Sequence, residues 1–175
     1  NFKKKFPWLP AMINVDLPRY NDQYIMPSNY CLGEFQCAYG SYMLTKINKI
    51  NNLKRKKASK FINTFREFDF IKFHLVKTKR HNYHLLVAEI KNNLRNKIMS
   101  DLNYKYKIQV VAQYYPLHLY DFYKKTNNYK ANCPNTEQFY FNMISFPFSS
   151  HMSDSDFSYL IEKTYETLKY YSKYN

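Results

Sequence analysis

Glycine is nearly absent from this chain of 175 residues, which contains only Gly33 and Gly40. A glycine-rich loop that wraps a phosphate needs several glycines close together, so a loop of that kind is excluded. Cysteine is scarce as well: Cys31, Cys37 and Cys133 are an odd number, and the first two fit neither a CxxC pair nor one turn of a helix. The sequence therefore predicts no disulfide framework and no zinc cluster, and it favours a reducing, cytoplasmic compartment.

Long hydrophobic runs are also missing. No apolar run approaches the roughly 18 residues that span a bilayer, and the N-terminal segment NFKKKFPWLP lacks the continuous apolar core of a signal peptide. We therefore expect no membrane anchor. The first residue is Asn rather than Met, so we expect the chain to be either processed or the downstream part of a longer protein.

Acidic residues are in the minority, with 13 Asp and Glu against 27 Lys and Arg and a net charge of +14. Such a balance is typical of proteins that bind nucleic acid or phosphate-bearing ligands. However, Asn, Lys, Ile, Phe and Tyr are all abundant, as they are in proteins encoded by AT-rich codons. Part of the positive charge can therefore reflect composition rather than a binding surface, and a nucleic-acid role is the less favoured interpretation.

Hydrophobic residues make up 45% of the chain and aromatic residues 19%, enough for one ordinary domain with a real core. The strongest structural prediction is a long amphipathic helix from Ser28 to Phe65. This stretch contains no proline, and its apolar residues recur at steps of three and four. They are Leu32, Phe35, Tyr39, Met43, Ile47, Ile50, Leu53, Ala58, Phe61, Ile62 and Phe65.

Shorter elements follow this helix. The strand expected at 83–90 is almost entirely apolar, which is typical of burial on both faces. Ser153 and Asp156 have the spacing of a capping box at the start of a last helix, and Asn135 is expected to cap an earlier one. Further strands are expected at 70–76 and 108–113, and a brief extended segment at 144–146. Helices are expected at 93–104, 135–143 and from 153 onward, with a short helical turn at 117–125. This order predicts an α+β fold with a small sheet covered by helices.

The residues alone do not define a catalytic set. The motifs GxSxG, HExxH and CxxC are absent. Among the five histidines, His81 and His84 are three residues apart, so on a strand they would point to opposite faces, and we expect no metal site. His118 follows a strand end, where pockets often form. The basic residues at 54–57, 60 and 77–80 could bind phosphate, but a solvated helix face and a charged loop explain them more simply.

Several segments, covering about residues 27 to 170, resemble the DegT/DnrJ/EryC1/StrS aminotransferases. NYCLGEFQCAYG at 29–40 resembles the family's N-Y-R-M-S/T-E-L-Q-A-A-L-G, and HNYHLLV at 81–87 resembles H-x-Y-H-L-x-V. QYYPLH at 113–118 resembles H-Y-P-P-L-H, and ISFP at 144–147 resembles L-S-L-P. Their common order makes coincidence an unlikely explanation.

The resemblance implies the C-terminal part of a fold-type I enzyme that uses pyridoxal 5'-phosphate. Such enzymes move an amino group, typically from glutamate, onto a keto-sugar attached to a nucleotide, and they are usually homodimers. The family's catalytic lysine lies upstream of the Asn-Tyr-Arg segment, so we expect no catalytic residue in this chain and no activity from it alone. We expect residues 1–30 to pack on a missing large domain, 31–68 to form a connecting helix and 69–175 a small α+β domain.

The same resemblance assigns site residues. Asn29 matches the asparagine that contacts the cofactor phosphate of the partner subunit, although it would also serve as a helix cap. Tyr30, Tyr115 and His118 match the substrate side of the site.

Two positions depart from the family pattern: Cys31 replaces an arginine and Gln113 replaces a histidine. These changes put the usual nucleotide-sugar substrate in question. Two alternatives stay open: a stand-alone basic nucleic-acid-binding module, and a truncated or split subunit that acts as a dimerisation partner.

Overall fold

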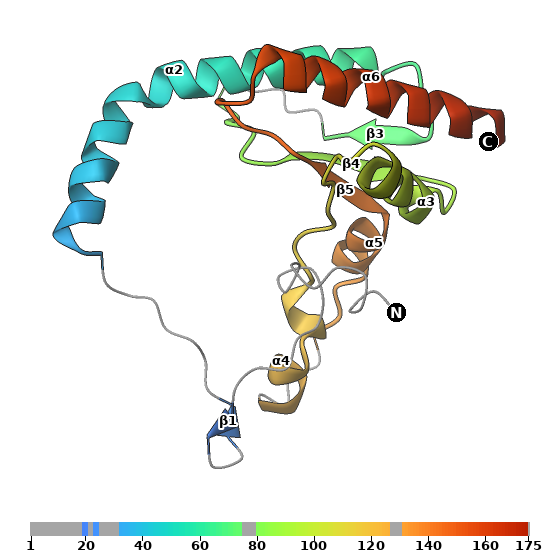
Figure 1. Cartoon of the computed structure of the whole chain (residues 1–175). Coiled ribbons are helices and arrows are strands. Elements are labelled where there is room, and N and C mark those ends of the chain that lie inside the picture. The colour runs from blue at the N-terminus through green and yellow to red at the C-terminus, as the bar shows by residue number, and fades with distance from the viewer. Residues whose placement is uncertain (1–18, 21–22, 25–31, 75–79, 127–130, 175) are drawn as a thin grey trace.

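A three-stranded antiparallel sheet lies at the centre of the computed structural model, which describes residues 19–20, 23–24, 32–74, 80–126 and 131–174. Its strands lie in the order β3 (Ile71–Phe73), β4 (Leu86–Ile90) and β5 (Met143–Phe146). Helix α6 (Asp154–Tyr171) and the C-terminal half of α2 (Glu34–Thr64) run side by side along the sheet (Figure 1). The predicted α+β class, with a small sheet covered by helices, is confirmed.

The strand register explains which face of the sheet these helices cover. Phe73 pairs with Ala88, which in turn pairs with Ile144, so their side chains share one face. Phe61 of α2 packs on that face, with its ring 6.0 Å from the ring of Phe73 and 4.8 Å from that of Phe146. The core therefore lies between the sheet and the two long helices.

Two sheet predictions need correction. Strand β4 is not buried on both faces: Leu86, Ala88 and Ile90 are buried, whereas the alternate residues Val87 and Glu89 are half-buried. The predicted strand at 108–113 forms only a single bridge, between Val111 and Ser145. The segment does not continue as a strand: the chain turns at Gln109, where the Val110 N–H donates to the Ile108 carbonyl, and the Ile108 N–H donates to the Leu102 carbonyl.

Helix α2 differs from its prediction at the N-terminal end. It begins at Glu34, whereas Ser28, the predicted start, lies outside the described residues. Only Ala58, Phe61 and Ile62 are buried within it. The N-terminal half extends past the sheet as a separate arm (Figure 1), so most of the predicted apolar face is exposed there. At 1.5 Å per residue, this 31-residue helix is about 45 Å long.

The remaining helices are short. The predicted 93–104 helix begins only at α3 (Arg95–Ser100), because Asn92 and Asn93 have positive φ angles of 59° and 56°. It continues as the π-helix η2 (Asp101–Lys105). Helix α5 (Pro134–Asn142) is preceded by Cys133, so Asn135 is not its cap as predicted; Pro134 starts the helix because its fixed φ suits the first position.

The other elements agree with the prediction or add to it. The helical turn expected at 117–125 is present as the 3-10 helix η3 (Leu117–Leu119) and α4 (Asp121–Thr126). Strand β1 (Arg19–Tyr20) pairs antiparallel with β2 (Gln23–Tyr24), and a 3-10 turn, η4 (Ser172–Tyr174), follows α6. Within the described residues, no helix has the length and apolar character needed to cross a membrane.

The predicted cap of the last helix is confirmed. The Ser153 hydroxyl accepts a hydrogen bond from the Asp156 backbone N–H at 3.0 Å and donates to the Asp156 carboxylate at 2.6 Å. Ser153 thus satisfies one of the free N–H groups at the start of α6.

We expect Ser153→Ala to lower the free energy of unfolding by about 1 kcal/mol, because that N–H loses its acceptor. Urea unfolding followed by circular dichroism would measure the loss. Ser158→Ala, at an exposed position in the same helix, is the matched control and should change stability by no more than about 0.5 kcal/mol. Equal effects of the two substitutions would show that the cap contributes nothing specific.

Candidate functional site

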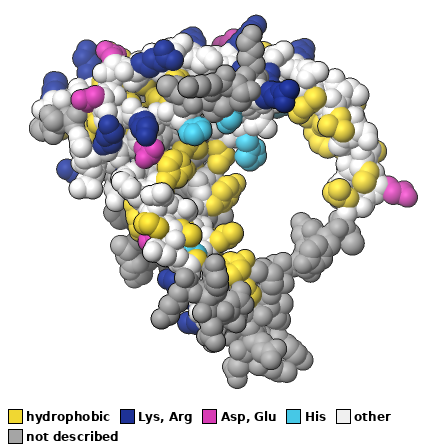
Figure 2. Space-filling view, turned by 180° about the vertical axis from the view of Figure 1, so that it is seen from behind, with side chains coloured by type: hydrophobic (Ala, Val, Ile, Leu, Met, Phe, Trp, Pro, Cys, Tyr) yellow, Lys and Arg dark blue, Asp and Glu magenta, His cyan; other side chains and the backbone are white. Residues whose placement is uncertain are grey.

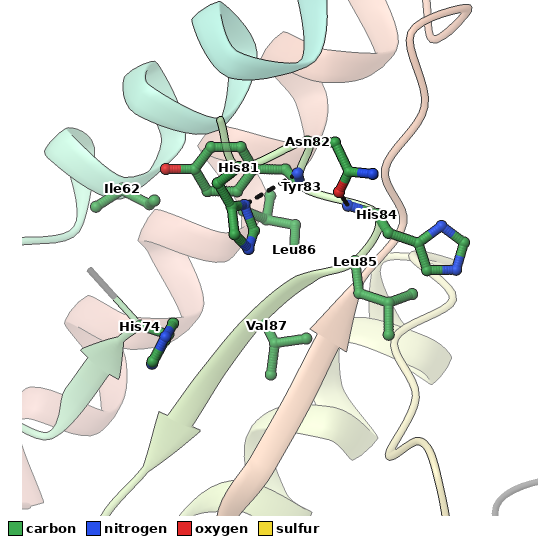
Figure 3. Close-up of a pocket in the computed structure, with 9 residues that line it drawn as sticks. All are labelled: Ile62, His74, His81, Asn82, Tyr83, His84, Leu85, Leu86 and Val87. Atoms are coloured by element: carbon green, nitrogen blue, oxygen red, sulfur yellow. Dashed lines mark hydrogen bonds between the residues drawn. The ribbon is translucent and has the colours of Figure 1, made fainter. Parts of the chain in front are cut away.

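Two neighbouring pockets lie beside the start of β4 and share His84 and Leu85. The first, called here the imidazole pocket, measures about 300 Å³. The second, called here the motif pocket, measures about 350 Å³. Figure 3 shows the imidazole pocket, and Figure 2 shows histidine side chains gathered beside hydrophobic ones on this side of the molecule.

The motif pocket brings together three of the segments that resemble the aminotransferase family. Val111 and Ser145 exchange backbone hydrogen bonds of 3.0 and 2.7 Å, which holds the 109–113 segment against β5. Gln109 and Gln113 therefore lie on either side of Val111, along the outer edge of β5. The lining residues are His84, Leu85, Gln109, Val111, Gln113, Ser145, Phe146, Pro147 and Phe148.

The segment before β4 is a loop, which corrects the placement of His81 and His84 on a strand. Tyr83 has a φ of 48°, which a strand does not allow. His81 Nδ1 accepts a hydrogen bond from the Tyr83 N–H at 3.0 Å, and the Asn82 side-chain oxygen accepts one from the His84 N–H at 3.1 Å. These side-chain hydrogen bonds form turns within the loop, so strand β4 begins only at Leu86.

Three basic residues of α2 have structural partners, so the interpretation of this helix face as simply solvated is incomplete. Arg55 Nε donates to the His81 carbonyl at 3.0 Å, and Lys54 donates to the His84 carbonyl at 3.4 Å. Burial lowers the pKa of Lys54. Lys57 donates to the Met152 carbonyl and lies 3.8 Å from the Asp154 carboxylate. These contacts fasten α2 to the pocket loop and to the start of α6, and they weaken the nucleic-acid alternative.

Tyr115 and His118 are held on the side of helix α5. His118 Nε2 lies 3.0 Å from the Glu137 carboxylate. The Tyr115 ring packs edge-on against Tyr120 and Tyr140, at 4.9 and 5.4 Å between ring centres. Burial raises the pKa of Tyr115, with a further contribution from the nearby carboxylates. Neither residue lines the imidazole pocket or the motif pocket, whereas Gln113 of the same segment does.

Asn29 and Tyr30, the other two predicted site residues, lie outside the described residues. The described part of the chain contains no group of three or more His, Cys, Asp or Glu side chains that could hold a metal ion.

The sequence interpretation did not bring His74 near the loop at 81–85. His74 follows β3 and lines the imidazole pocket on the same side as His81 (Figure 3). The sequence interpretation placed His74 and His81 on separate strands, so it did not predict that they line the same pocket. The Asn at position 82 was the available signal, because Asn between two polar residues is typical of a turn.

Solved aminotransferases share this architecture. *Helicobacter pylori* PseC, an aminotransferase involved in the biosynthesis of pseudoaminic acid, superposes with a TM-score of 0.70 and 21% identity over 97% of this chain and 46% of its own. The pyridoxal-phosphate form of the sugar aminotransferase Spr1654 from *Streptococcus pneumoniae* gives a TM-score of 0.69 and 21% identity, over 85% of this chain and 39% of its own. The fold is therefore that of a part of these enzymes.

The sequence model that represents the DegT/DnrJ/EryC1/StrS aminotransferase family matches residues 12–164. The chain therefore belongs to that family. The resemblance drawn from the sequence is confirmed. The spore coat polysaccharide biosynthesis protein SpsC of *Bacillus subtilis* is 25% identical over 142 residues, which is 78% of this chain but 36% of SpsC. The chain thus spans less than half the length of each of these relatives.

Proposed function

We propose that this chain is the C-terminal part of a sugar aminotransferase that transfers an amino group, with glutamate as donor, to a keto-sugar carried on a nucleotide. The observation that carries the proposal is the motif pocket, where three family motifs separated in sequence meet around Gln113 and Ser145. Membership of the aminotransferase family supplies the reaction class. A cytoplasmic homodimer is the form we propose for the assembled enzyme.

Pyridoxal 5'-phosphate is the cofactor that we propose, and when bound it supplies the carbonyl that accepts the amino group. The described pockets do not fit the whole cofactor, because no lysine lines either the imidazole pocket or the motif pocket. The lysine that holds the cofactor would therefore come from an upstream large domain. From this chain, we propose Asn29 as a contact to the cofactor phosphate.

We propose the domain division 1–30, 31–68 and 69–175, in which 31–68 is the connecting helix, and residues 1–30 and the arm of α2 dock on the large domain. The arm of α2 supports this division. Leu32 is 77% exposed and Phe35 83% exposed on the arm, and a stripe of large apolar side chains of this kind marks an interaction surface. The chain alone would then be inactive, because it lacks the lysine and leaves this stripe uncovered.

The substrate contacts that we propose are Tyr30, Tyr115 and His118. His118 is half-buried and oriented by the Glu137 carboxylate, which leaves one imidazole nitrogen for a hydroxyl or phosphate oxygen. Gln113 offers an amide in place of the family's histidine, so it can donate and accept hydrogen bonds but does not change charge with pH.

The test compares the chain alone with the chain joined to the large domain encoded upstream of it. With pyridoxal phosphate and glutamate, we expect the joined protein to convert the cofactor to its pyridoxamine form, seen as a change in its absorbance spectrum. The chain alone should leave the spectrum unchanged. Conversion by the chain alone, or none by the joined protein, would contradict the proposal.

A mixture of the two parts, expressed separately, tests the split-subunit alternative. Activity and co-purification of the mixture would show that the chain works as a separate subunit, whereas activity of the joined protein alone would exclude that arrangement.

A further inference from the structure

The imidazole pocket shares His84 with the motif pocket but has further polar groups that the motif pocket lacks. It is walled by aliphatic side chains of α2 and β4 and by the Tyr83 ring, with His74 and His81 on one side (Figure 3). The residues that line it are Ile62, His74, His81, Asn82, Tyr83, His84, Leu85, Leu86 and Val87. None of them is acidic.

The His81 ring is fixed with a proton donor available to the pocket. Its Nδ1 accepts the Tyr83 N–H at 3.0 Å, so a neutral imidazole carries its proton on Nε2. The ring also packs edge-on against Tyr83, with 4.4 Å between ring centres. Figure 3 shows the second nitrogen of His81 on the side where His74 lies, while the His84 ring points away from both.

Among the described residues, the groups whose charge acts on His81 are His74 and Arg55, and both disfavour a charged His81 ring. Arg55 on α2 donates to the His81 carbonyl, and its Nη1 donates to the Asn52 side-chain oxygen at 2.9 Å rather than to a carboxylate. Burial lowers the pKa of His81 first, and the charges of His74 and Arg55 lower it further. An anion in the pocket would relieve this repulsion. The titratable groups that face His81 are His74 after β3, Lys54 and Arg55 on α2, and Tyr83 and His84 on its own loop.

We propose that the imidazole pocket binds a small phosphate-bearing anion, held by the imidazoles of His74 and His81 in the positive field of Arg55. Two imidazole donors and a nearby guanidinium suit a tetrahedral oxyanion, and the aliphatic walls leave room for an attached organic group. A metal ion is disfavoured because the described residues supply no third ligand and Arg55 would repel it. The site does not depend on the amino transfer proposed above.

Sulfate is the first probe, because its own charge stays constant between pH 5.5 and 8, so a change in binding over this range comes from the protein. In the 175-residue chain, we expect sulfate to shift the side-chain NMR signals of His74 and His81 together, and we expect both shifts to saturate. The dissociation constant should be several-fold higher at pH 8 than at pH 5.5, because a protonated imidazole holds an anion more strongly than a neutral one. Failure to saturate, or a dissociation constant independent of pH, would overturn the proposal.

Substitutions locate the site. His74→Gln should weaken sulfate binding about fivefold or more, and it leaves the hydrogen bond between His81 and the Tyr83 N–H intact. His81→Gln should weaken sulfate binding by a similar factor, but it also removes that hydrogen bond. His151→Gln, at an exposed loop histidine, is the matched control and should bind sulfate unchanged. Equal binding by all three variants would refute the assignment.

Two further probes identify the ligand. If zinc shifts the signals of His74 and His81 while sulfate does not, the pocket is a metal site and the proposal is wrong. If uridine diphosphate binds more tightly than orthophosphate, the phosphate belongs to a nucleotide; equal affinities indicate free phosphate. Either of these last two results supports the site.

Discussion

Replacing Phe61 with alanine is expected to lower the free energy of unfolding by about 3–5 kcal/mol, the range for removing a buried phenylalanine. Phe61 is fully buried, and its ring is 4.6 Å from Phe65, 4.8 Å from Phe146 and 6.5 Å from Phe157. These partners come from α2, the sheet and α6. The cavity left by alanine would therefore lie where α2, α6 and the sheet meet. Neither helix can move to fill it without losing its own contacts with the sheet.

Urea unfolding of the 175-residue chain, followed by circular dichroism, would measure the change from the midpoint and the slope. Phe35→Ala is the matched control, since it makes the same change in the same helix at a position that is 83% exposed. We expect its effect to stay within about 0.5 kcal/mol. A loss below about 1 kcal/mol for Phe61→Ala would mean that α2 is not part of the core.

The steps of three and four in the α2 sequence predicted the helix correctly but not which part of its apolar face is buried. Periodicity reports that one face is apolar, and it does so equally for a core contact and for a contact with another domain. Phe61 and Phe35 belong to the same pattern, yet one is buried and the other exposed. Only the position of the sheet relative to the helix separates them.

A local feature could be predicted from the sequence where a single interaction between nearby residues determines it. The Ser153 cap could be predicted because it needs only Ser153 and Asp156, three residues apart. The 108–113 segment was predicted wrongly, because its β-branched residues favour a strand while the N–H of Ile108 donates to the Leu102 carbonyl, a contact that composition does not reveal.

The candidate site could be predicted only in part, for the same reason. The family motifs contain His84, Gln113 and Ser145, which the motif pocket brings together. However, the site residues assigned from them, Tyr115 and His118, line neither pocket. The imidazole pocket depends on Arg55 reaching the His81 carbonyl across 26 positions in sequence. No spacing rule predicts a contact of that kind, because the loop that offers the carbonyl is shaped by its own turn.

In the protein joined to its large domain, Phe35→Asp is expected to remove most of the activity by preventing the arm of α2 from docking. This prediction rests on the proposed function. Burying a carboxylate in place of the Phe35 ring loses the apolar contact and adds the cost of an unpaired charge, together about 3 kcal/mol or more. Such a loss is more than 100-fold in the docking equilibrium.

Activity with glutamate and a keto-sugar nucleotide would measure the effect, and sedimentation would report the assembly. Ser41→Asp adds the same charge to an exposed position about 120° from Phe35 around the helix and should keep both assembly and activity. In the 175-residue chain alone, Phe35→Asp should leave stability almost unchanged, because the side chain is exposed there. A joined protein that carries Phe35→Asp and still assembles and reacts normally would show that the apolar stripe on α2 has another role.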